Sequence, residues 1–186
     1  MRVLLPFPVV VPILFAALTV VFHRSRAAQR AIAIAGVSAA LVASVGILVV
    51  VERDGPQSVT LAGWPAVVGI ALVADLFSAL LLVVSLITVL AVLVFAVGQR
   101  HSDDLVAFHP TYLALTAGVS LSFLTGDLFN LFVSFEVMLT ASYVLLTLGG
   151  TRERVRSGMT YVVISLLASA LFITPGLPTV VPTSIA

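Results

Sequence analysis

The chain has 186 residues, of which 61% are hydrophobic and only 9% are charged, and its net charge is +1. A soluble domain carries about 25% charged residues, so this chain has too few polar side chains to cover a water-facing surface. The composition therefore indicates a membrane protein, and it excludes a strongly basic nucleic-acid binder. The absence of cysteine excludes disulfides, thiolate chemistry and iron–sulfur ligation by this sequence.

Long uncharged apolar runs, separated by charged or turn-forming segments, predict six helices. The first run contains three prolines and ends at His23 and Arg24. Basic residues after an apolar run favour a retained helix over the alternative, a cleaved signal peptide. The residues between the second and third runs, 57–64, are expected to form an exposed loop. The predicted helices cover residues 4–22, 31–51, 71–97, 108–124, 128–148 and 158–174, and an irregular tail follows at 175–186.

These runs are apolar on every side, which predicts an all-α, polytopic transmembrane helical bundle occupying residues 1–174 as one region. Arginine placement predicts its orientation, because loops rich in arginine stay in the cytoplasm. The loops after the first, third and fifth helices hold Arg24, Arg26, Arg30, Arg100, Arg152, Arg154 and Arg156, and the other side holds Arg2 and Arg53. Both termini are therefore expected outside the cell.

Glu136 lies near the centre of the fifth apolar run and hence near the middle of the bilayer. An ionisable group at this depth costs at least about 2.5–3.5 kcal/mol and is retained where it faces protein or water. A low dielectric favours the neutral form of a carboxyl group, so such a group exchanges protons readily. This favours Glu136 as a proton carrier over a purely structural role.

Three hydroxyl side chains, those of Thr140, Tyr143 and Thr147, share a helical face with Glu136 and predict a polar stripe toward the cytoplasmic end. The stripe could support a chain of water molecules, or each hydroxyl could bond its own backbone or a neighbouring helix, which is common in membrane helices. Asp127 begins the fifth helix, and Asp75 lies near the outer end of the third. Either residue could cap a helix or lie at the mouth of a pathway.

The three histidines do not form a metal-ligand spacing, and the sequence contains no phosphate-binding loop and no recognisable catalytic triad. We therefore expect no cofactor, no metal and no enzymatic activity of the chain's own.

The segment 125–139, TGDLFNLFVSFEVML, and its continuation ASYVLL at 141–146 closely resemble the fifth-helix signature of the antiporter-like membrane subunits. This group includes the Mrp-type Na+/H+ antiporter D subunit and the proton-pumping membrane subunits of respiratory complex I. The segment is most similar to the Mrp D subunit, and VADLFSAL at 73–80 and YVVIS at 161–165 also fit it. The resemblance covers roughly residues 1–173.

The resemblance implies a multi-pass subunit in the bacterial cytoplasmic membrane, with other antiporter subunits, protons and monovalent cations such as Na+ as its partners. It also implies that Glu136 occupies the position of the family's essential proton-pathway glutamate. Family members have more helices and pair this glutamate with a lysine on the seventh helix, whereas this sequence contains no lysine. The resemblance therefore predicts a truncated or split-gene form, or a fragment, that lacks a complete pathway.

Two other functions fit the sequence. One is a proton-translocating membrane subunit of an NADH-quinone oxidoreductase or hydrogenase-like complex, without redox centres of its own. The other is a structural membrane module that transports nothing.

Overall fold

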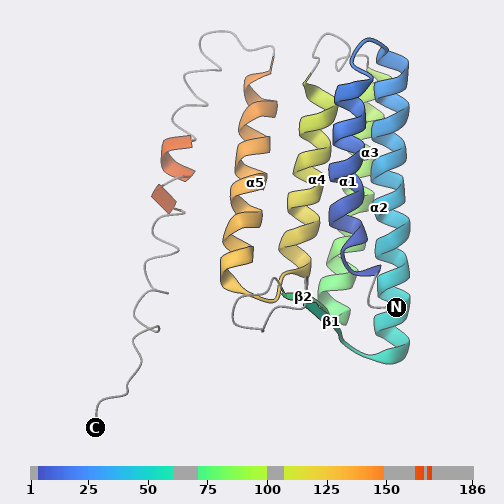
Figure 1. The fold of residues 1–186 in the computed structure, drawn as a ribbon, viewed down its shortest axis with the longest axis vertical. Coiled ribbons are helices and arrows are strands. Elements are labelled where there is room, and N and C mark those ends of the chain that lie inside the picture. Colours follow the sequence, from blue (N-terminus) through green and yellow to red (C-terminus); the bar gives the residue numbers. More distant parts are fainter. Residues whose placement is uncertain (1–3, 61–70, 100–106, 149–161, 166, 169–186) are drawn as a thin grey trace.

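The computed structural model describes residues 4–60, 71–99, 107–148, 162–165 and 167–168, and it shows antiparallel helices with two short strands at one end (Figure 1). The elements are α1 (Phe7–Val21), α2 (Arg26–Asp54), β1 (Gln57–Thr60), β2 (Ala71–Ala74), α3 (Leu76–Gly98), α4 (Phe108–Leu124) and α5 (Leu128–Thr147). Residues 162–165 and 167–168 are also helical and fall within the range predicted for a sixth helix. The rest of that range and the tail 175–186 lie outside the described residues.

The predominantly helical fold confirms the predicted class, but two expectations about the segment between α2 and α3 were wrong. Residues 71–74, predicted to start the third helix, form β2, and residues 57–60, predicted as loop, form β1. The strands pair antiparallel, with Gln57 opposite Ala74 and Thr60 opposite Ala71. Asp75 caps α3, so the helix begins only at Leu76.

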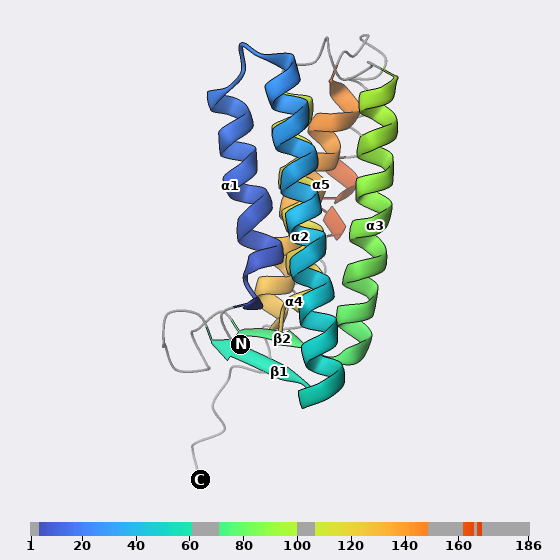
Figure 2. The same cartoon turned by 90° about the vertical axis from the view of Figure 1, so that its right-hand side faces the viewer.

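α4 lies between α5 and the other helices and packs against all four of them (Figures 1 and 2). The buried side chains of the two hydrophobic clusters come from α2, α3, α4, β2 and Leu5. α5 packs extensively against α4 alone among the described elements. The helix that carries Glu136 therefore stands at one side of the bundle.

Three of the described helices, α2, α3 and α5, are long and apolar enough to cross a membrane. α1 and α4 have 15 and 17 residues. At 1.5 Å per residue they reach roughly 22 and 26 Å, a little less than the hydrocarbon thickness of about 30 Å. Together these lengths describe a membrane protein with several spans.

Candidate functional site: a groove beside Glu136

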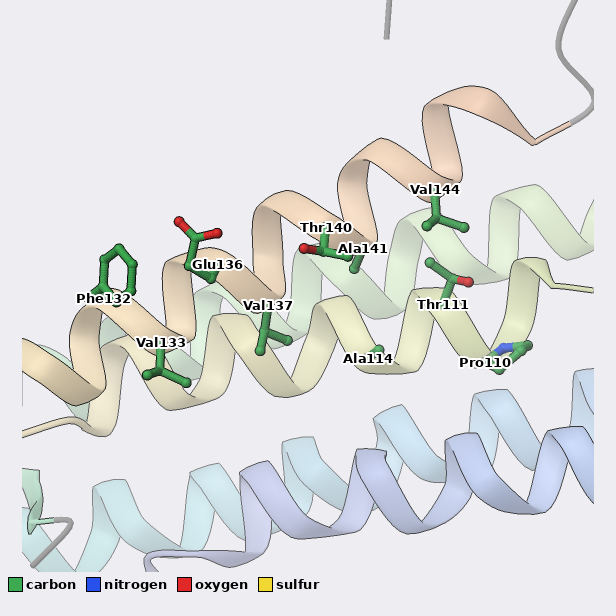
Figure 3. Close-up of a pocket in the computed structure, with 10 residues that line it drawn as sticks. All are labelled: Pro110, Thr111, Ala114, Phe132, Val133, Glu136, Val137, Thr140, Ala141 and Val144. Atoms are coloured by element: carbon green, nitrogen blue, oxygen red, sulfur yellow. The ribbon is translucent and has the colours of Figure 1, made fainter. Parts of the chain in front are cut away.

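Glu136 is the ninth of the twenty residues of α5 and lines an open groove of about 610 Å³ between α5 and α4. The groove is mostly apolar, and Thr111, Glu136 and Thr140 supply its hydrogen-bonding side chains. Its lining residues are Pro110, Thr111, Ala114, Phe132, Val133, Glu136, Val137, Thr140, Ala141 and Val144 (Figure 3).

The Glu136 side chain projects from α5 on the side away from the α4 ribbon, whereas Val133 and Val137 point toward α4 (Figure 3). Glu136 as a whole is half-buried, and its Oε1 atom is buried without a hydrogen-bond partner among the residues that the structure describes. An ionised oxygen without a donor is costly in an apolar setting, whereas a protonated carboxyl group is tolerated more easily. One of the two carboxyl oxygens of Glu136 is thus left without a donor among the described residues.

The structure brings together only the first half of the predicted polar stripe. Glu136 and Thr140 both line the groove, but Tyr143 and Thr147 are not among its lining residues. The Thr147 hydroxyl instead donates to the backbone oxygens of Tyr143, at 2.9 Å, and Val144, at 3.1 Å. The Thr147 hydroxyl is therefore bonded to its own helix, which is one of the two possibilities that the sequence left open.

Sequence reasoning missed the α4 side of the groove, formed by Pro110, Thr111 and Ala114. These residues are unremarkable in an apolar run, and only the packing of α5 on α4 brings them into the groove that Glu136 also lines. Gly118 makes that packing close, because a Cβ atom there would lie 2.9 Å from Met138 Cγ and 3.2 Å from Met138 N. Small residues at such crossings let membrane helices approach closely.

Asp127 and Asp75 are both helix caps at the end of the bundle that holds the strands (Figure 2). Asp127 Oδ1 accepts a 2.7 Å hydrogen bond from the backbone N–H of Asn130. Asp75 Oδ1 accepts a 2.7 Å bond from the Ser78 N–H, and the Ser78 hydroxyl accepts from the Asp75 N–H at 3.0 Å, which completes a capping box. Neither carboxylate lines the groove, so the geometry supports the capping role for both.

The Asp75 cap predicts a dependence of stability on acid pH. Hydrogen bonds from Ser78, the backbone N–H first, lower the pKa of Asp75 from its ordinary 3.8. A carboxyl group with a lowered pKa stabilises the fold above its unfolded-state pKa, and the contribution is lost as the pH falls through the folded-state value. Between about pH 6 and pH 3, wild type is therefore expected to lose more stability than Asp75→Asn, which cannot titrate. Unfolding in detergent at each pH measures this, and parallel losses would contradict it.

Among the residues described, no group of three or more histidine, aspartate or glutamate side chains is arranged to hold a metal ion. The fold and the groove define a class: a multi-span helical membrane protein with a carboxyl group midway along one span.

Comparison with known proteins narrows this class. No protein-family model matches the chain. The Na+/H+ antiporter D subunit of Alkalihalophilus pseudofirmus is 41% identical over 174 residues, which are 93% of this chain and 35% of that protein. The Na+/H+ antiporter D subunit of Bacillus subtilis is 38% identical over 170 residues, 89% of this chain and 34% of that protein.

Among solved structures, a chain of the Mrp complex from Dietzia sp. superposes with a TM-score of 0.80 at 33% identity, over 91% of this chain and 33% of that one. The protein is thus a homologue of the D subunits of Mrp-type Na+/H+ antiporters and spans about a third of the length of the relatives it matches. A chain of an archaeal membrane-bound sulfane sulfur reductase has a TM-score of 0.82 at 22% identity, which shows a shared fold alone.

Proposed function

We propose that the chain contributes to a membrane subunit of a monovalent cation/proton antiporter and that Glu136 carries protons within it. The observation that carries the proposal is the place of the Glu136 carboxyl group, midway along a spanning helix, with one buried oxygen that has no partner in the described part of the chain. Its likeness to antiporter D subunits supports the same role.

The groove suggests how proton transfer would work. A carboxyl group in a mostly apolar groove is more stable when it holds a proton, so it takes one up from a wetted path and releases it where water or a cation stabilises the charge. The Thr140 hydroxyl, one helical turn further along α5, can accept from the protonated carboxyl group or hold a water molecule. Other membrane subunits and helices would supply the rest of the path.

The alternative of a respiratory proton-pumping complex shares the fold, since the sulfane sulfur reductase belongs to an archaeal respiratory membrane complex. The antiporter function is favoured because the identities of 41% and 38% are to proteins named as antiporter subunits.

The direct test is a cation-dependent pH change in everted membrane vesicles from an antiporter-deficient host. The full chain is expressed together with its flanking genes, and Glu136→Gln is compared with wild type. A Glu136-dependent signal supports the proposal, and equal signals in both would overturn it.

The predicted orientation, with the arginine-rich end in the cytoplasm, has a separate test. Because the sequence lacks cysteine, His23→Cys and Ser58→Cys each create a unique thiol, and both positions are exposed at opposite ends of the bundle. An impermeant thiol reagent applied to intact cells is expected to label Ser58→Cys and to spare His23→Cys until the membrane is opened. The reverse pattern would contradict the orientation.

A further inference from the structure

The connection between α4 and α5, residues 125–127, is bonded to strand β2 through backbone groups. The backbone N–H of Gly126 donates a 2.8 Å hydrogen bond to the Ala71 oxygen, and Thr125 forms an antiparallel bridge with Leu72. Both strands lie beneath α4, at the end of the bundle where α3 begins (Figure 2). The segment before α3 is thereby joined to the segment before α5.

A side chain at Gly126 would require its neighbours in β2 to shift. A Cβ atom at Gly126 would lie 2.7 Å from Val73 Cγ2 and 3.3 Å from the Ala71 oxygen. The φ angle of Gly126 is not positive, since Gly55 is the positive-φ glycine of the described chain. Space, rather than backbone conformation, therefore favours glycine at this position. Val73 is β-branched and restricted about χ1, so it does not yield freely.

Two close contacts thus fix the position of the α5 axis relative to the rest of the bundle. One is the Gly126 contact with β2, just before the helix begins, and the other is the crossing of Gly118 with Met138. Glu136 lies between these contacts along α5. Since α5 packs extensively against α4 alone, a shift at either contact moves Glu136 relative to the α4 side of the groove.

We propose that Gly126, seated against Val73 of β2, is a positioning residue that sets the place of the Glu136 carboxyl group in the groove. The proposal rests on the proposed function for the importance of Glu136, but the positioning itself is measurable without transport. Adding a side chain at Gly126 pushes the start of α5 away from β2, opens the groove and lets water reach Glu136.

The test uses a hydrophobic carbodiimide, which modifies protonated carboxyl groups in apolar surroundings. The full chain, co-expressed with its flanking genes, is treated in membranes, and modification at position 136 is followed by mass spectrometry. Gly126→Ala is expected to slow this modification by about threefold or more, because water that reaches the carboxyl group stabilises its ionised form, which the reagent does not modify. Gly98→Ala is the matched control, because a Cβ atom there meets nothing within 4 Å.

A second substitution separates positioning from general damage to the fold. Val73→Ala removes the Cγ2 atom that the new Cβ would meet, so the double variant Val73→Ala/Gly126→Ala is expected to recover most of the wild-type rate. An unchanged rate in Gly126→Ala, or a slow rate that Val73→Ala does not restore, would overturn the positioning role.

The vesicle assay on the same membranes keeps the two proposals apart. Glu136-dependent transport with an unchanged modification rate in Gly126→Ala would refute the positioning role and leave the proposed function standing. A slowed and rescued modification rate without Glu136-dependent transport would support the positioning role and refute the proposed function.

Discussion

Everted vesicles that carry Glu136→Gln are expected to lose the cation-dependent pH change altogether. Glutamine has nearly the size and shape of glutamic acid but cannot release or bind a proton at neutral pH, so the groove is preserved while its titrating group is removed. The amide also avoids the cost of about 2.5–3.5 kcal/mol for a charge at mid-bilayer, so the variant is expected to insert at least as well as wild type. Vesicle pH measurements and membrane-bound protein levels check both statements.

Two further variants make this result specific to position 136. Asp75→Asn makes the same carboxyl-to-amide change at a helix cap, and asparagine also caps helices, so transport is expected to remain. Glu136→Asp keeps a titrating carboxyl group on a shorter side chain and is expected to transport more slowly without losing activity. Loss of transport in Asp75→Asn, or full transport in Glu136→Gln, would contradict Glu136 as the proton carrier.

Gly36→Ala is expected to lower the stability of the bundle by overpacking the contact between α1 and α2. A Cβ atom on Gly36 would lie 2.7 Å from Phe15 Cβ and 2.9 Å from Phe15 Cγ, where α2 meets α1. The Cβ atom of Phe15 is fixed to its backbone, so α1 itself must move. Overpacking of this kind costs about 1–3 kcal/mol, which unfolding in mixed detergent micelles can measure.

The control for Gly36→Ala is again Gly98→Ala, which also adds a methyl group to a helix but fills open space. It is expected to be neutral or slightly stabilising, because alanine favours helix more than glycine does. Equal effects of the two substitutions would show that the α1–α2 contact adjusts without cost. Truncation of Phe15 to alanine removes the Cγ contact but keeps the Cβ contact, so it should not restore stability in the Gly36→Ala background, and it creates a cavity of its own.

Hydrophobic runs predicted the helical class because each run was long, uncharged and bounded by turn residues or arginine. They failed at 71–74, since Ala71, Leu72 and Val73 are as apolar as the helix that follows, and only pairing with β1 makes them a strand. Composition cannot show that pairing, which depends on backbone hydrogen bonds between segments that lie apart in the sequence.

Of the residues of the candidate site, too, some could be predicted from the sequence and others could not. Glu136 and Thr140 could be predicted from α5 alone, because their spacing of four places them on one face. Thr111 and Ala114 could not, because nothing within α4 marks which side receives α5. For Asp75 and Asp127, sequence reasoning left capping and a pathway role open, and only the hydrogen bonds of the folded chain distinguish the two.

The edge position of α5 has a consequence for how the protein is made. The fully buried members of both hydrophobic clusters precede residue 125, so the scaffold of α1 to α4 acquires its interior before the segment bearing Glu136 leaves the ribosome. We expect the translocon to release a packed four-helix platform onto which α5 docks afterwards. The costly acidic side chain then enters the bilayer on a helix that already has a packed protein surface to dock against.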